Sequence, residues 1–173
     1  MRRPGSLLAI AIAIVAYSSA FAFPEGAPWG AANPDAEDNC SGCHFDYDAI
    51  RDSTALTLDG LPARLTPGGT YDFTIRFADP DAVIAGFQMI ATPADQRSGN
   101  FTSAAENVEF IGAAIRSTKP RKMDDEVSWS LRWSAPDPIE KTIMFYLAVT
   151  GSNDDGSPFG DRIHFRTFRL PTD

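Results

Sequence analysis

The chain has 173 residues, a length that suggests one domain, and 43% of them are hydrophobic, enough for a core of normal size. It carries 23 acidic and 15 basic residues, a net charge of −8. Nucleic-acid binding needs a basic surface, so this balance argues against a nucleic-acid partner. It also disfavours an anionic membrane surface, but it allows a basic protein partner. The 13 glycines and 13 prolines favour a turn-rich β protein over a helix bundle.

The first 22 residues have the features of a cleaved export signal. Two arginines follow Met1, residues 7–17 are uninterrupted apolar sequence, and residues 20–22 read Ala-Phe-Ala, a small-residue cleavage pattern. The apolar run is shorter than the roughly 20 residues that span a bilayer. We therefore expect a signal peptide over 1–22, a mature chain that begins near Phe23 with a net charge of −10, and a periplasmic or extracellular location. An uncleaved membrane anchor is the alternative.

Residues 23–52 are dense in proline, glycine, alanine and acids, and show no helical or strand period, so we expect an extended arm with at most a short helical turn after His44. Residues 53–173 instead show repeated period-2 patterns between turn signals, which indicates an all-β domain, an antiparallel β-sandwich. The expected strands cover residues 55–62, 71–77, 83–93, 107–115, 126–136, 141–151 and 161–170.

Two kinds of strand are expected within this sandwich. Residues 71–77 and 127–133 alternate between apolar and polar side chains, so each has one buried face. Residues 83–93 and 141–151 are apolar almost throughout, which is typical of strands buried on both faces.

The arm contains the motif Cys40-Ser41-Gly42-Cys43-His44, with the only two cysteines of the chain and one of its two histidines. Two thiols followed directly by an imidazole are the pattern that attaches haem c, with His44 as the proximal iron ligand. We therefore expect one covalent haem on Cys40 and Cys43. The alternatives are a local disulfide or redox pair and a metal site, although structural zinc needs four ligands and only three are close together.

Several segments carry a family resemblance. In order, GAPWG, CSGCHFD, GLPARLTPGGTYDFTIRF, AGFQMIA, LRWSAP and FYLAVTGSNDDGSPFGD, within residues 26–168, resemble the bacterial reelin-domain-like family often labelled choice-of-anchor V. The resemblance implies an exported sandwich of the reeler, immunoglobulin-like type, with a CxxCH motif near the mature N-terminus that Cys40, Cys43 and His44 match. Members often carry a second histidine in the loop before the Trp-x-Ala-Pro strand, but residues 116–136 here contain none.

The second axial position of the expected haem is therefore open to other residues. Met123 lies in the same loop, and a thioether ligand would raise the reduction potential. His164 is the alternative distal ligand, although its place between two arginines indicates an exposed position on the last strand. Met89 and Met144 lie in apolar strands and are expected to fill the core.

Other residues are candidates for parts of a site. Trp29 and Phe45 flank the motif and are candidates for walls of a haem pocket. The acidic residues of the arm and the loop 152–157 lack the spacing of a calcium loop, so we expect them to be solvated. With one of the two histidines assigned to the haem, the sequence gives no argument for a Ser-His-Asp arrangement, and we expect no enzyme.

These observations lead to two hypotheses. The first is an exported mono-haem c protein that acts in electron transfer or in redox or haem sensing, with a redox partner protein that is basic. The second is a non-catalytic adhesion or binding module of reelin type, in which Cys40 and Cys43 form only a local disulfide.

Overall fold

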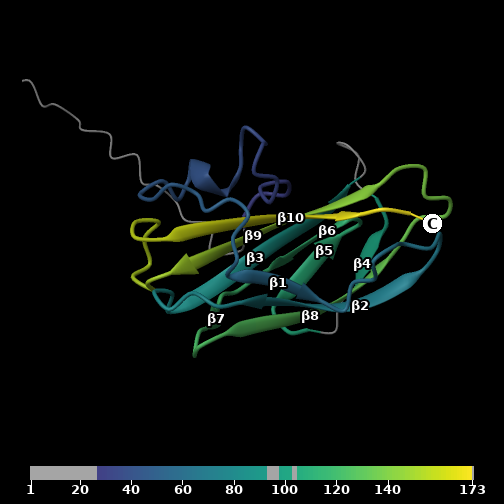
Figure 1. Cartoon of the computed structure of the whole chain (residues 1–173). Helices are drawn as coiled ribbons and strands as arrows, with labels where there is room; N and C mark the ends of the chain where they lie inside the picture. The colour runs from purple at the N-terminus through teal and green to yellow at the C-terminus, as the bar shows by residue number, and fades with distance from the viewer. Residues whose placement is uncertain (1–26, 93–97, 103–104, 173) are drawn as a thin grey trace, which may run out of the picture.

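The computed structural model describes residues 27–92, 98–102 and 105–172, and the expected signal peptide lies outside them. These residues form two antiparallel sheets packed face to face (Figure 1). The four-stranded sheet has the order β1 (Leu56–Asp59), β2 (Thr70–Phe77), β8 (Val127–Ser134), β4 (Asn100–Thr102). The six-stranded sheet has the order β10 (Arg162–Leu170), β9 (Ile143–Ser152), β3 (Ile84–Thr92), β6 (Ala114–Ser117), β5 (Val108–Ile111), and the short β7 (Arg121–Lys122) also pairs with β3.

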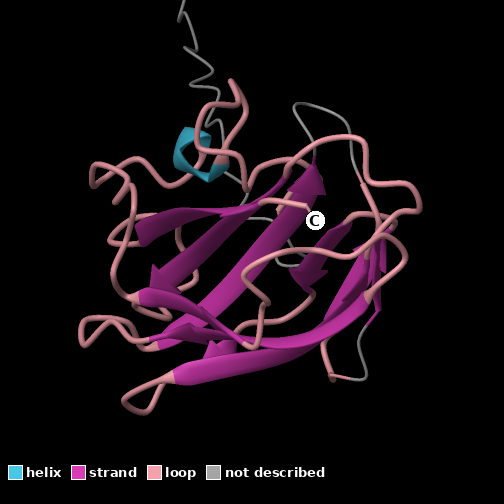
Figure 2. Cartoon of the chain, turned by 45° about the vertical axis from the view of Figure 1, so that its right-hand side comes forward, coloured by secondary structure: helices cyan, strands magenta, loops and turns pink. Residues whose placement is uncertain are grey.

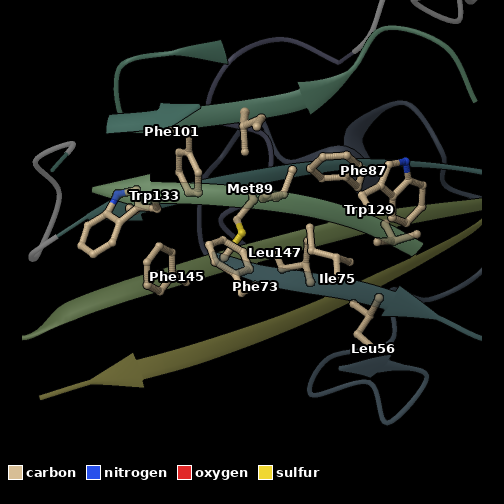
Figure 3. Close-up of a cluster of buried hydrophobic side chains, with 14 of the residues drawn as sticks. Leu56, Phe73, Ile75, Phe87, Met89, Phe101, Trp129, Trp133, Phe145 and Leu147 are labelled. Atoms are coloured by element: carbon tan, nitrogen blue, oxygen red, sulfur yellow. The ribbon is translucent and has the colours of Figure 1, made fainter. Parts of the chain in front are cut away.

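The main core lies between the two sheets (Figure 3). Alternate residues of β2 and β8 face it, as the period-2 pattern predicts, and they meet β3 and β9. At one end Trp133 packs edge-on against Phe145, with 5.0 Å between the ring centroids. The expected all-β antiparallel sandwich is confirmed.

Three details differ from the expected strands. Residues 107–115 form a hairpin, β5 and β6, because Gly112 takes a left-handed backbone with φ of +56° that turns the chain back. The short β4 and β7 were not anticipated, since two or three residues are too few to show a period. No helical turn follows His44. The one helical segment among the described residues is the 3-10 turn η1 (Cys40–Gly42), drawn in cyan in Figure 2.

The arm explains why strands β3 and β9 are apolar on both faces. Its residues lie over the outer face of the six-stranded sheet, as the purple-to-blue segment above β10 and β9 shows in Figure 1. A second, smaller core forms there, in which the buried residues are Ala32, Ile90, Ala114, Ala148, Ile163 and Phe165. Within the described ranges, no helix has the length and apolar character needed to cross a bilayer.

Candidate functional site

The CxxCH motif is folded into a single tight turn. The side chain of Asn39 caps η1 by accepting a hydrogen bond from the Ser41 amide at 2.9 Å. The amides of Cys43 and His44 both donate to the carbonyl of Cys40, at 3.4 and 3.3 Å. This turn places the two thiols and the imidazole on one short stretch of backbone.

A pocket of about 510 Å³ lies between this turn and the outer face of the six-stranded sheet. Its volume falls in the range of roughly 300–1,000 Å³ that is usual for small-molecule and cofactor sites. Cys40, Cys43 and His44 line its arm side, and residues 84–88 of β3 line its sheet side together with the loop 117–120. The lining is mostly apolar.

The buried side chain of Gln88 holds the arm over the pocket. Its Oε1 accepts hydrogen bonds from the amides of Gly30 and Ala32, at 2.9 and 3.2 Å, and its Nε2 donates to the Pro28 carbonyl at 2.8 Å. The amide group of Gln88 is buried in strand β3, and the arm provides the hydrogen-bond partners that such a buried polar group needs. The sequence gives no sign that Gln88 holds the arm, because one polar residue in an apolar strand forms no pattern.

The two cysteines lie in different surroundings. Cys40 packs against the smaller core and its Sγ donates to the Ala31 carbonyl at 3.3 Å, while Cys43 is exposed. Burial raises the pKa of the Cys40 thiol from 9.0 to about 12. Both thiols are free in this structure.

This difference predicts unequal alkylation of the haem-free, reduced protein. Iodoacetamide reacts with thiolates, and a pKa of about 12 in place of 9.0 leaves Cys40 with about a thousandfold fewer thiolates at pH 8. We expect Cys43 to be labelled rapidly and Cys40 at least a hundredfold more slowly, as followed by peptide mass analysis. In 8 M urea the two rates should converge. Equal rates in the folded protein would contradict the burial of Cys40.

His44 has a carboxylate directly behind its ring. Its Nδ1 lies 2.8 Å from Asp161 Oδ2, an ion-pair distance, and Asp161 is only 4% exposed. The angle of this contact is not that of a hydrogen bond, so Nδ1 of His44 and Oδ1 of Asp161 have no hydrogen-bond partner among the described residues. A carboxylate beside one ring nitrogen is the usual support of a metal-bound imidazole, because it orients the ring and leaves the other nitrogen for the metal.

The residues present therefore fit a covalently bound haem in three respects. Two thiols and an imidazole share one turn, that turn lines an apolar pocket of cofactor size, and a buried carboxylate contacts the imidazole on the Nδ1 side. In that arrangement Nε2 of His44 is the nitrogen available to iron.

The expected distal ligand Met123 is not brought to this pocket. Its side chain packs against the main core between the sheets, and its amide donates to the Val83 carbonyl at 2.9 Å. Met123 is absent from the pocket lining. The choice of Met123 is therefore not supported, because the loop that carries it turns its side chain to the opposite side of the six-stranded sheet.

His164 corrects a second expectation, because it is buried rather than exposed, with 3% of its surface accessible. Its Nδ1 lies 2.8 Å from Ser53 Oγ and its Nε2 lies 3.0 Å from Asp79 Oδ2. Both ring nitrogens are thus engaged, and the ring packs edge-on against Phe77 at 4.9 Å between centroids. His164 lies inside the sandwich, away from the pocket lining, and neither nitrogen is available to a haem there.

The Ser53–His164–Asp79 series was not anticipated from the sequence, since the three residues are widely separated along the chain. All three are buried, with exposed fractions of 3%, 3% and 6%, so no substrate reaches the hydroxyl. A carboxylate only accepts hydrogen bonds, which places the proton of the neutral ring on Nε2 and makes Ser53 the donor to Nδ1. The series ties the first residue after the arm to β10 and to the loop after β2.

The remaining candidates lie outside the pocket. Trp29 stacks under the guanidinium of Arg116, at 4.4 Å, and Phe45 contacts Phe159 edge-on at 5.7 Å, so neither lines the pocket as expected. For the acidic clusters, the described residues contain no group of three or more His, Cys, Asp or Glu placed to hold a metal ion.

Comparison with known proteins gives a match in structure but not in sequence. No protein-family model matches the chain, and no curated protein matches it. The human F-spondin reeler domain (fragment 1) superimposes with a TM-score of 0.54 and 19% identity, over 72% of this chain and 95% of that one. The Reelin-N domain of F-spondin gives a TM-score of 0.57 and 20% identity, over 75% and 94%. Membership of the choice-of-anchor V group stays a prediction, but the chain has the reeler-type β-sandwich fold.

Proposed function

We propose that this chain is an exported, non-catalytic binding module that carries one haem c, attached covalently through Cys40 and Cys43 and bound at the iron by His44. One observation carries the proposal: both cysteines and the histidine of the CxxCH turn line an apolar pocket of about 510 Å³ on the outer face of the six-stranded sheet. A disulfide alone needs no such pocket.

Each part of the site has a role in this proposal. Haem c, when bound, supplies a one-electron centre whose potential depends on its ligands and on burial. Asp161, whose Oδ2 lies 2.8 Å from Nδ1 of His44, leaves Nε2 as the nitrogen for iron. The arm excludes water from one side of the pocket, and Gln88 fixes the arm to β3.

The acidic character of the chain supports a basic redox partner. The described arm alone carries six acidic residues, Asp35, Glu37, Asp38, Asp46, Asp48 and Asp52, against the single Arg51. Charges of one sign around a site steer a partner of opposite sign towards it. The proposed role is accordingly electron transfer, or redox sensing, with a basic partner protein.

A second candidate function follows from the fold. The structural neighbours are reeler domains, and the two cysteines lie within one turn of each other. In this candidate the chain is a haem-free adhesion or binding module, with a Cys40–Cys43 disulfide that stiffens the arm.

An absorption spectrum separates the two functions. We expect the protein, exported from a host with intact haem-attachment machinery, to show the Soret band and, after reduction, the α band of a c-type haem. The colour should remain with the polypeptide on a denaturing gel stained for haem peroxidase activity, because thioether bonds survive denaturation. A colourless protein whose mass is two hydrogens below that of the dithiol form would establish the disulfide module instead.

A further inference from the structure

Few side chains that line the pocket are able to bind a haem iron. Among its described lining residues, the nitrogen or sulfur donors of this kind are the two cysteines, His44 and Lys119. The cysteines are used by the thioether bonds, and amide side chains such as that of Gln88 have no free lone pair on nitrogen. We propose that the amine of Lys119 is the sixth ligand of the iron, on the haem face that His44 leaves free; this inference rests on the proposed haem site.

The backbone around Lys119 is held firmly against β3. On one side, Ser117 Oγ accepts a hydrogen bond from the Phe87 amide at 2.9 Å, and the Thr118 amide donates to the Asn107 carbonyl at 2.8 Å. On the other side, strand β7 pairs with the start of β3. Pro120 restricts the residue before it to extended conformations. The loop therefore presents Lys119 at the pocket from a fixed position.

The Lys119 side chain is suited to reach an iron bound in the pocket. It is exposed, and within the described residues no ion pair or hydrogen bond engages its ammonium group. Its four-carbon stem is flexible, so the amine is able to cover several ångströms without a shift of the backbone. Binding to iron replaces a proton of the ammonium group with a metal–nitrogen bond and releases that proton to solvent.

Residues 116–136 contain no histidine, and Met123 packs against the main core, so neither source supplies a ligand to the pocket. Lys119 precedes β7 and lines the pocket, whereas Met123 follows β7 and packs against the main core. No other nitrogen ligand comes from the described part of this loop to the pocket.

The test compares the spectra of haem-loaded variants. We expect the wild type to be six-coordinate and low-spin, without the near-infrared band of a methionine ligand. Lys119→Ala should convert the iron to high spin and allow rapid binding of carbon monoxide in the reduced state. Lys119→Arg should do the same, because it keeps the positive charge but does not ligate iron. Lys119→His should restore a low-spin spectrum with altered g-values.

Lys122→Ala is the matched control, because Lys122 is an exposed lysine of the neighbouring β7 that does not line the pocket, and its spectrum should equal that of the wild type. Haem staining of denatured protein is measured in parallel for every variant. If Lys119→Ala or Lys119→Arg stains for haem and keeps the low-spin spectrum of the wild type, the result would overturn Lys119 as the ligand. The proposed haem site would still stand. A wild type without covalent haem would overturn both the site and the ligand.

Discussion

Replacement of Trp133 with alanine is expected to cost about 3–5 kcal/mol of the free energy of unfolding, the usual range for removal of a fully buried large aromatic side chain. Trp133 has no exposed surface, and its ring packs edge-on against Phe145 and stacks with Tyr71. Its Nε1 also donates to the Ser98 carbonyl at 3.2 Å, so the substitution leaves that acceptor without this donor. Chemical denaturation followed by circular dichroism measures the loss.

Phe159→Ala is the control for this variant. Phe159 is also aromatic, but 49% of it is exposed and it contacts only the exposed Phe45 ring among the aromatic pairs. We expect its effect to stay within about 1 kcal/mol. Similar losses in the two variants would mean that Trp133 is not fully buried in the core.

Replacement of Asp79 with alanine is expected to destabilise the fold by about 1–3 kcal/mol, because it removes the acceptor of a buried imidazole N–H. The carboxylate accepts from Nε2 of His164 at 3.0 Å through one oxygen and from the Asp81 amide at 3.0 Å through the other. Asp81→Ala is the control, since Asp81 is exposed and its ion pair with Arg162 lies in solvent, where such pairs contribute about 0–1 kcal/mol. A loss in Asp79→Ala no larger than in Asp81→Ala would contradict a structural role for the buried series.

The same series makes stability depend on pH. Burial lowers the pKa of His164 below its ordinary value of 6.5; the carboxylate of Asp79 opposes this shift and the guanidinium of Arg162 adds to it. The imidazole of His164 therefore becomes protonated near pH 6.5 in the unfolded chain, but only at a lower pH in the folded chain. Stability is then full above this pH and falls as the pH drops from about 6.5 towards the lower folded pKa. His164→Gln, which carries no titrating group there, should lose this part of the slope in denaturation measured from pH 7.5 to 5. An unchanged slope would contradict the lowered pKa.

The alternating strands show what the sequence is able to predict. The period-2 pattern correctly indicates that the main core is faced by Phe73, Ile75, Trp129 and Leu131. In a strand with one buried face, apolar residues occupy alternate positions, so the sequence shows which side chains are buried. Burial of β3 and β9 on both faces was also predictable, but what covers the outer face was not. The arm has no period of its own, and only the structure shows that it lies on that face.

The last strand shows why the site was only partly predictable. In Arg-Ile-His-Phe-Arg, residues 162–166, the arginines on either side of His164 indicate a polar face. The arm instead covers Ile163 and Phe165, which lie on the other face of the strand. The face that carries His164 therefore points into the sandwich, and His164 is buried. The sequence alone shows the spacing of Cys40, Cys43 and His44, because these residues are close together in the chain. Asp161 and Lys119 join it only through the fold, and no local pattern indicates them.

The contact between the arm and β10 sets an order of events during folding. Ile50 bridges to His164, and Ser53 reaches the same histidine across 111 positions of sequence, so the arm docks only after the last strand has been made and paired with β9. Cys40 therefore stays unburied until β10 has formed and paired with β9. Closure of such a long loop is slow compared with local turns. The thiol of Cys40, which the finished fold buries, is therefore open to chemical modification until the arm docks.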